Sequence, residues 1–321
     1  MLLRDFSKNL TLKRTAKALL LLPPIFVLIL ILVACSSSSP PASLKTASAS
    51  RDFVDEAGRK VSIPAKIERI ASLAPNLTEI VYAVGAGDRL VGNTTFCDYP
   101  PEAKNVEKVG DTLQPSIERI LALRPQLVLV STASQLEAFT KQLDEHDIAV
   151  YVTDPGDLEG VFRSIISVGD LLNESLAAAE LVKQLRARSE TVERAVAGLA
   201  PVSVFFQLSG QPLYTAGRSS FVTNLIERAG GRSVTSDVHA AWPRLSDERA
   251  LASRPEAVIM LSGDAMGAAA NTNVAAALRN SPAVQNGRVY LIDGDLLTRP
   301  GPRLVDGLEQ IAHALHPKAF K

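Results

Sequence analysis

A ten-residue phrase occurs twice in this chain, as SIERILALRP at Ser116–Pro125 and as SDERALASRP at Ser246–Pro255. Seven of the ten positions match, and each copy runs into an apolar, strand-like stretch. A repeat of this length, followed by the same kind of element, constrains the architecture more than a single motif does. The copies lie 130 positions apart, which is too far for a solenoid. The repeat therefore predicts two related lobes with a groove between them.

The first 35 residues have the pattern of an export signal. A basic segment precedes an apolar run from Ala18 to Val33, and the small-residue sequence LVAC ends at Cys35. This end resembles a bacterial lipobox, which predicts a lipoprotein signal peptide over residues 1–35 and a lipid on Cys35. Residues 36–50, rich in Ser, Ala and Pro, are predicted to be a flexible tether. A transmembrane helix is the alternative, which the two prolines in the apolar run and the cleavage site disfavour.

The rest of the chain is therefore expected outside the cytoplasm, in the periplasm or on the outer cell surface. Its length, about 270 residues, is enough for two domains of ordinary size. Lys plus Arg and Asp plus Glu balance at 34 each, so nothing indicates bulk attraction to nucleic acid. Cys97 is the only cysteine after Cys35, so no disulfide is expected within the mature chain.

From Arg51 onward, short apolar runs alternate with amphipathic helical patterns. This alternation predicts an α/β fold of two similar lobes, each a mainly parallel sheet covered by helices. The predicted strands are 67–73, 89–92, 127–130, 149–152, 203–207, 257–261 and 289–292. The predicted helices are 76–85 (capped by Asn76), 116–123, 135–146, 158–172, 220–229, 246–252 and 304–315.

The segment Glu174–Leu199 has no proline, one glycine and many strong helix formers. It predicts a helix of about 37 Å, the longest in the chain. Because it falls between the two copies of the repeat, we expect it to join the lobes rigidly. The predicted organisation is a first lobe over 51–172, a connecting helix over 173–199 and a second lobe over 200–321.

These features together resemble the helical-backbone, or class III, solute-binding proteins of bacterial ABC importers. The resemblance covers Arg51–Leu315 and includes the stretches SLAPNLTEIVYAVGAGDRLVG and CDYPPEA and the twin S-x-E-R phrase. AAWPRLSDERAL and DLLTRPGPR look most like the cobalamin (vitamin B12)-binding branch. The resemblance implies capture of a corrinoid between the lobes and delivery to the permease subunits of an importer. Relatives on this scaffold bind ferric siderophores, haem, zinc or manganese, so a siderophore or haem ligand stays open as an alternative.

Two aromatic residues are candidate walls of the ligand site. Trp242 is followed by Pro243 in a loop-like context, which predicts a partly exposed ring that suits a large planar ligand. A core aromatic is the alternative interpretation. The resemblance places Tyr99 facing the groove, where its phenol can stack on a macrocycle or ligate iron. Otherwise Tyr99 is a turn residue that packs on proline.

Asp295 and Arg299 are the candidate polar contacts, and the matching family stretch forms part of the ligand-contacting rim. Corrinoids carry amides and a phosphate, which a guanidinium and a carboxylate can bind. A local ion pair is the alternative. The chain departs from the cobalamin branch at Thr112-Leu113, about where close relatives have a tryptophan. This departure removes one aromatic wall and predicts an altered affinity or a different corrinoid.

Glu118 and Glu248 are the acids that the two copies share. Each is expected in the first turn of a helix, after Ser116 or Ser246 as cap, where the helix dipole favours a carboxylate. Stabilisation of the helix end alone is one interpretation. The resemblance implies another, in which the two glutamates contact arginines on the two transmembrane subunits.

No metal site and no enzymatic activity are expected, and the resemblance implies no cofactor, only a transported ligand. The four histidines (146, 239, 313 and 316) show no paired ligand spacing, and we find no catalytic motif. Cys97 has no assignable base and is predicted to be a free, partly buried thiol. An extracytoplasmic enzyme that uses the cleft is the remote alternative. The protein is expected to be a monomer.

Overall fold

The fold is described from a computed structural model, which covers residues 50–131, 136–263 and 273–320. The predicted signal peptide, Cys35 and residues 36–49 of the predicted tether lie outside the described residues. So does residue 135, the predicted first residue of one helix.

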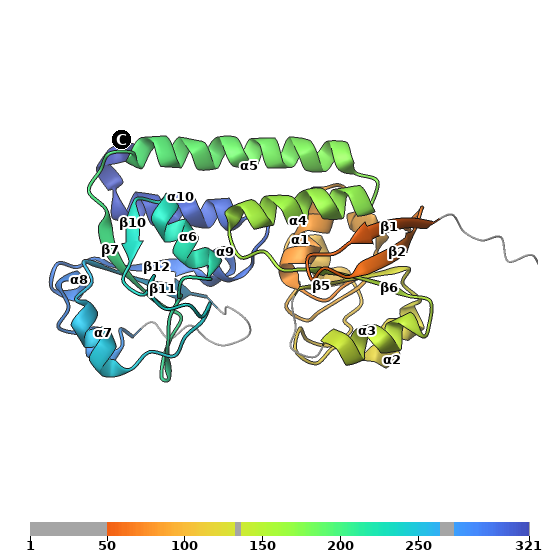
Figure 1. The fold of residues 1–321 in the computed structure, drawn as a ribbon, viewed down its shortest axis with the longest axis horizontal. Helices are drawn as coiled ribbons and strands as arrows, with labels where there is room; N and C mark the ends of the chain where they lie inside the picture. Colours follow the sequence, from red (N-terminus) through yellow and green to blue (C-terminus); the bar gives the residue numbers. More distant parts are fainter. Residues whose placement is uncertain (1–49, 132–135, 264–272, 321) are drawn as a thin grey trace, which may run out of the picture. The chain divides into compact units, whose positions relative to one another are not determined.

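The first lobe contains a parallel sheet in the strand order β4-β3-β5-β6 (Figure 1). Its strands are β3 (Ile70–Ser72), β4 (Leu90–Asn93), β5 (Leu127–Ser131) and β6 (Ala149–Thr153). Successive residues of β5 point to opposite faces and enter two different buried clusters. One face packs against α1 (Pro75–Ala83) and α4 (Leu158–Leu171), and the other against α2 (Ile117–Leu123) and α3 (Leu136–Asp144). Because both faces are covered, the strands are almost entirely apolar.

The second lobe repeats this plan with a parallel sheet in the order β10-β7-β11-β12. Its strands are β7 (Val202–Gln207), β10 (Gly231–Ser233), β11 (Ala257–Ser262) and β12 (Val289–Asp293). One face packs against α6 (Phe221–Arg228), α9 (Gly294–Thr298) and α10 (Leu304–Leu315). The other packs against α7 (Asp247–Ser253), α8 (Pro282–Gln285) and the 3-10 turn η4 (Ala276–Leu278).

The two sheets correspond strand for strand. The repeated phrase forms α2 before β5 in the first lobe and α7 before β11 in the second, and β5 and β11 hold the same place in their sheets. Both helices end on an arginine in the left-handed conformation, Arg124 at φ 46° and Arg254 at φ 41°. The prediction of two similar α/β lobes is confirmed.

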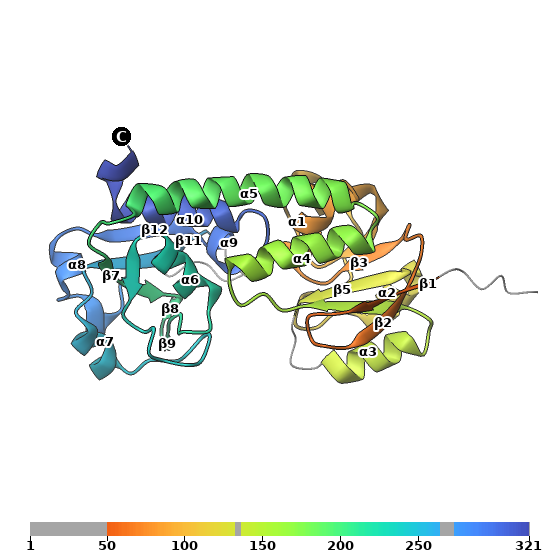
Figure 2. The ribbon, with the colours of Figure 1, turned by 45° about the horizontal axis from the view of Figure 1, so that its top comes forward.

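Helix α5 (Ser175–Val196) connects the lobes and packs on α4 of the first and α10 of the second (Figure 2). Its apolar side chains belong to a buried cluster that contains residues of both sheets. On α5, Arg186 pairs with Glu159 of α4 at 2.5 Å. Arg188 contacts two acids of α10, Asp306 at 2.5 Å and Glu309 at 2.6 Å. The connecting helix is shorter than predicted because Ala197 is extended and Gly198 has a φ of 77°.

Other bounds of the prediction also differ from the structure: of the predicted strand 67–73 only Ile70–Ser72 is a strand. Helix α1 begins one residue earlier than expected, with Ala74 as N-cap and Pro75 in the first position, where a missing N–H costs nothing. Asn76 therefore does not cap the helix; it is buried and donates to the Pro300 carbonyl at 3.3 Å. The tether also ends sooner than residue 50, because Ser50 already belongs to the antiparallel hairpin of β1 (Ser50–Val54) and β2 (Lys60–Pro64).

Candidate ligand-binding site

The loop after β4 carries Tyr99, and the side chain of Lys108 hydrogen-bonds to the backbone of this loop. The ammonium of Lys108 donates to the Asn93 side chain at 2.7 Å and to the carbonyls of Cys97 at 3.1 Å and Ala103 at 3.0 Å. Burial lowers the pKa of Lys108. Three donated hydrogen bonds from one cation hold this loop in a single conformation.

Cys97 lies under the same loop and is buried. Its sulfur lies 3.2 Å from the hydroxyls of Thr78 and Thr94. The prediction of a free thiol is confirmed, although the side chain is more deeply buried than expected.

Tyr99 projects from this loop, with 45% of the residue exposed. The guanidinium of Arg303, which comes from the second lobe, lies 4.0 Å from the centre of its ring. A cation over an aromatic face stabilises the ring's orientation. Tyr99 therefore offers a half-exposed ring, fixed in orientation by Arg303, at a contact between the lobes.

Helix α9 carries Asp295 in its first turn and ends at the C-cap residue Arg299, so the two side chains lie close together. Asp293 caps the helix by accepting from the backbone N–H of Asp295 at 2.9 Å. Arg299 contacts Asp295 at 2.8 Å and, across the lobes, Asp98 at 2.6 Å. Only 9% of Arg299 is exposed. The local ion pair is thus present, and it is part of a larger set of contacts between the lobes.

Glu79 on α1 completes this set and was not predicted from the sequence. Only 3% of the residue is exposed. Its carboxylate accepts two hydrogen bonds from Arg303, at 3.0 and 2.6 Å, and lies 3.7 Å from Arg299. We call Glu79, Asp98, Asp295, Arg299 and Arg303 the interlobe ionic cluster.

The acids of the interlobe ionic cluster differ in their pKa values. Burial raises the pKa of Glu79, and the two arginines only partly offset that effect. Burial also raises the pKa of Asp295. For Asp98, burial is outweighed by the hydrogen bond and charge of Arg299, so its pKa is lowered. The cluster thus holds three acids against two permanent cations, and Asp98 is the most firmly ionised of the three.

The echo between α1 and α6 gives a sequence signal for Glu79. Thr78-Glu79 in the first lobe matches Thr223-Asn224 in the second. Asn224 also reaches the other lobe, where its side-chain oxygen accepts from the backbone N–H of Leu158 at 3.2 Å. The equivalent position on the two helices is therefore an interlobe contact both times.

Trp242 lies outside the interlobe ionic cluster, in an aromatic cluster of the second lobe. Its ring packs edge-on against Phe221 at 5.6 Å between centroids and against Phe206 at 6.4 Å. The residue is half-buried and packs against the large core. The predicted partial exposure is confirmed, and the ring is held by the core on one side.

The first lobe differs at the Thr112-Leu113 stretch, about where the second lobe has Trp242. Leu113 is 81% exposed, and the preceding turn is closed by Asp111, whose carboxylate accepts from the N–H groups of Leu113 at 2.8 Å and Gln114 at 2.6 Å. An exposed leucine here supplies less flat surface than an indole does.

The shared acids Glu118 and Glu248 are both exposed in the first turn of their helices. The predicted caps are confirmed: Ser116 accepts from the Arg119 N–H and Ser246 from the Arg249 N–H, each at 3.3 Å. The pKa of Glu248 is lowered by hydrogen bonds from its own backbone N–H and from Ser246. Capping and an exposed charge are therefore present together.

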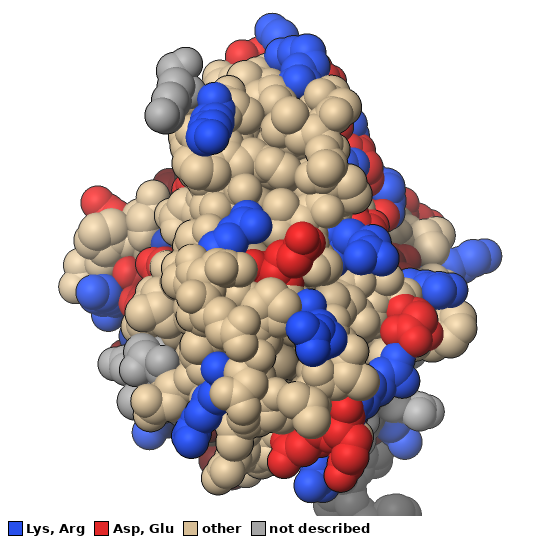
Figure 3. All heavy atoms as spheres, turned by 90° about the vertical axis from the view of Figure 1, so that its left-hand side faces the viewer, with Lys and Arg blue, Asp and Glu red and all other residues tan. Residues whose placement is uncertain are grey.

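The charged side chains on the second lobe form no large patch of one sign on the face shown in Figure 3. Figure 3 shows a face on which basic and acidic side chains are interspersed, without a broad patch of one sign. A partner that recognises this face by charge must contact a few neighbouring side chains.

Within the described part of the chain, no helix is long and apolar enough to cross a membrane. In the same ranges no three His, Cys, Asp or Glu side chains are grouped to hold a metal ion.

The sequence model of the periplasmic binding protein family matches residues 70–296. The uncharacterized ABC transporter substrate-binding lipoprotein YvrC of Bacillus subtilis is 32% identical over 274 residues, which cover 83% of this chain and 86% of that protein. The crystal structure of the periplasmic vitamin B12 binding protein BtuF of Vibrio cholerae is 29% identical, with a TM-score of 0.68, over 79% of this chain and 98% of that one. The periplasmic heme-binding protein RhuT from Roseiflexus sp. RS-1, in apo form, is 26% identical with a TM-score of 0.70, over 79% and 99%.

Proposed function

The chain belongs to the periplasmic binding protein family, as a substrate-binding protein of an ABC transporter, and on this premise we propose that its ligand is a corrinoid such as cobalamin. The ligand is bound between the lobes and delivered to the membrane subunits. The function is binding, without a chemical step.

The observation that best supports a corrinoid is the arrangement around Arg299. The guanidinium has five N–H groups, more than its contacts with Asp98 and Asp295 use. Its partner Asp98 immediately precedes Tyr99, on whose half-exposed ring Arg303 is stacked. A macrocycle with amide side chains and a phosphate needs an aromatic surface beside fixed donors and acceptors. Trp242 supplies a second aromatic surface.

Haem is the second candidate, and Tyr99 is the observation that favours it. A half-exposed phenol is a suitable ligand for ferric iron, and the guanidinium of Arg303 over its ring holds the ring's orientation. The same residue therefore serves either ligand, as a stacking surface in one case and as an iron ligand in the other.

A titration of the soluble protein, residues 36–321, distinguishes these ligands. Cyanocobalamin, cobinamide, haemin and a ferric siderophore are added in turn, and binding is followed by the fluorescence of Trp242, the only tryptophan, and by calorimetry. We expect both corrinoids to bind below the micromolar range. Failure of both to do so refutes the corrinoid proposal, and tight haemin binding that is lost in Tyr99→Phe establishes the second candidate.

We also propose that Glu118 and Glu248 contact basic residues on the two membrane subunits. Both are exposed, both follow a capping serine, and both lie on helices that the repeat makes equivalent. Two like acids on two like lobes suit a pair of similar subunits.

We propose further that Cys35 carries a lipid that anchors the protein. The LVAC sequence supports this, and one relative is itself named a lipoprotein. The test is fractionation of cells that express the wild type or Cys35→Ser. We expect the variant to leave the membrane fraction; its retention there would refute the lipid anchor.

A further inference from the structure

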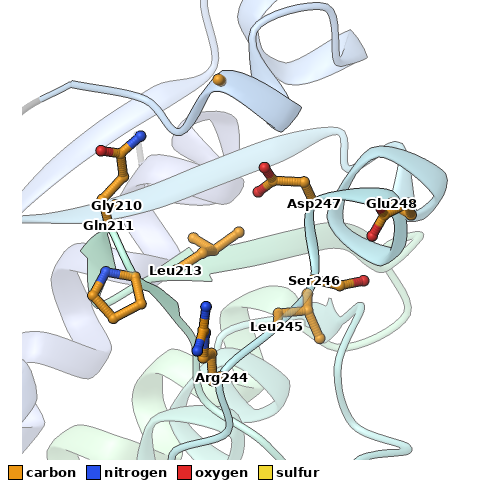
Figure 4. A pocket seen from close by; sticks show the side chains of 10 residues that line it. Gly210, Gln211, Leu213, Arg244, Leu245, Ser246, Asp247 and Glu248 are labelled. Carbon is orange, nitrogen blue, oxygen red and sulfur yellow. The ribbon is translucent and has the colours of Figure 1, made fainter.

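A cavity of about 740 Å³ lies in the second lobe beside the repeated phrase (Figure 4). Its lining includes the first residues of α7 and the tip of a hairpin, with Ala276 of η4 on another side. This volume is within the range of about 300–1,000 Å³ that is typical of pockets that bind ligands. Glu248, the proposed docking acid, is among the lining residues. We call this cavity the tip recess.

The hairpin that walls the tip recess consists of β8 (Ser209–Gly210) and β9 (Leu213–Tyr214). It is fixed to the segment before α7: the N–H of Leu245 donates to the Leu213 carbonyl at 2.9 Å. Leu213, Leu245 and Ala250 of α7 are buried in one apolar cluster. The wall is therefore held by both hydrogen bonds and packing, and the tip recess is preformed.

The first lobe lacks this hairpin. There, α1 follows β3 almost directly, from Ser72 to Pro75, whereas residues 208–220 intervene between the corresponding elements β7 and α6. The hairpin is thus an addition to the shared plan, and it lies next to the phrase that the lobes have in common.

The tip recess contains two opposite charges that the first lobe also lacks. Asp247 stands where the first copy has Ile117, and Arg244 stands where the first lobe has Gln114. Figure 4 shows both side chains pointing into the same space from opposite sides. Over the described residues, neither has an ion-pair partner, whereas the nearby Arg249 is paired with Asp237 at 2.6 Å. Two unpaired charges of opposite sign, held apart across a preformed cavity, suit a partner that carries the complementary pair.

We propose that the tip recess receives a protruding segment of one membrane subunit, with a basic side chain that meets Asp247 and Glu248. An acidic or amide side chain of the same segment meets Arg244. This inference rests on the proposed docking function and adds to it a difference between the two lobes. The shared glutamates engage both subunits alike, and the tip recess makes the second lobe's contact the more extensive one.

The test measures binding of the soluble protein to its importer in lipid nanodiscs, that is, to the two membrane subunits and their ATPase. Ala276→Trp fills the tip recess at an exposed position, and Asp247→Asn removes one charge. Ala177→Trp, on an exposed position of α5, is the matched control. We expect Ala276→Trp and Asp247→Asn each to weaken importer binding about tenfold. We expect Ala177→Trp to leave it unchanged, with thermal stability and ligand affinity equal in all three.

Three results overturn the proposal in distinguishable ways. If both recess variants bind the importer like the wild type while Glu248→Lys does not, the recess has no part in docking, and the glutamate contacts stand. If the wild type does not bind the importer, the docking function fails as well. A photo-crosslinker at Gln211 is expected to label a membrane subunit; labelling of a second copy of this chain, or of lipid alone, assigns the recess to another partner.

Discussion

The two copies of the repeated phrase fold alike, yet their surroundings differ. Each copy forms a seven-residue helix with a serine cap, an exposed glutamate and a left-handed arginine at its end. Before the second copy the chain has Trp242 on the aromatic cluster and Arg244 in the tip recess; before the first it has exposed Leu113 and Gln114. We propose the helix as the common docking element, and its unequal flanks as the features that distinguish the lobes for ligand and partner.

The largest expected effect tests what the copies share. Glu118→Lys combined with Glu248→Lys replaces both exposed acids with bases, which would face basic residues on the subunits. Loss of one partner of a buried, hydrogen-bonded charge pair at an interface costs about 2–5 kcal/mol. We therefore expect uptake of labelled ligand by whole cells to fall below detection.

The control for this prediction is ligand affinity, which must stay at the wild-type value because we propose both glutamates as docking residues outside the ligand site. Lost affinity would contradict the assigned role. Normal uptake would remove the docking function from both copies.

The next effect compares Glu79 with Asn224, the equivalent positions of α1 and α6. Glu79→Ala leaves Arg303 without its carboxylate partner at a largely buried site, whereas Arg299 keeps Asp98 and Asp295. We therefore expect a loss of about 3 kcal/mol in the free energy of unfolding. Asn224→Ala removes one hydrogen bond to a backbone N–H and is expected to cost about 1 kcal/mol. Urea denaturation measures both. Equal losses would show that the interlobe ionic cluster adds no stability beyond an ordinary hydrogen bond.

Glu79 also gives a pH dependence with a defined sign. Its pKa is raised in the folded state, so its favourable contribution is complete below the ordinary value of 4.5 and is lost as the pH rises through the raised pKa. Relative to Glu79→Gln, the wild type is therefore expected to be more stable at pH 4 than at pH 7. An advantage that grows with pH would contradict the raised pKa.

Substitution of Trp242 is expected to lower the affinity for the ligand more than it lowers the free energy of unfolding. Trp242→Ala removes a half-buried indole, and we expect corrinoid affinity to fall by about 2 kcal/mol, roughly thirtyfold. Trp242→Phe, which keeps an aromatic face, is the matched control and should lose only a few-fold. Because these variants lack tryptophan fluorescence, calorimetry is the measurement. Unchanged affinity in Trp242→Ala would exclude the ring from the site.

The smallest expected effect makes the first lobe more like the second. Leu113→Trp adds an indole at an exposed position of the Thr112-Leu113 stretch, which lies about where the second lobe has Trp242. We expect a gain in corrinoid affinity of about 1 kcal/mol, close to fivefold. Unchanged affinity would show that this flank takes no part in enclosing the ligand.

The sequence predicted the repeated architecture well because its signals are local. Each copy of the phrase specifies a helix, and the apolar run after it specifies a strand. The long segment rich in helix formers specifies the connecting helix. The strand order β4-β3-β5-β6 of the first sheet recurs as β10-β7-β11-β12 in the second. The cap assignments at Ser116 and Ser246 were also correct, because a cap depends on the residues of one turn.

Contacts between distant segments were beyond the sequence. Glu79 and Arg303 are 224 positions apart. The local sequence favours Asn76 as a cap, whereas its actual partner, the Pro300 carbonyl, is equally distant. The hairpin that walls the tip recess was missed because β8 and β9 have two residues each, too short to show a strand period. Burial of Arg299 follows from tertiary packing rather than from its own segment.

The position of the bound corrinoid tests the central claim most directly. Cobalt scatters anomalously, so crystals grown with cyanocobalamin and measured at the cobalt absorption edge locate the centre of the ring without bias. We predict one peak between the lobes, with the ring against Tyr99 and Trp242 and its polar substituents within hydrogen-bond reach of Asp295 or Arg299. A peak in the tip recess or elsewhere, or no peak at saturating ligand, would contradict the account.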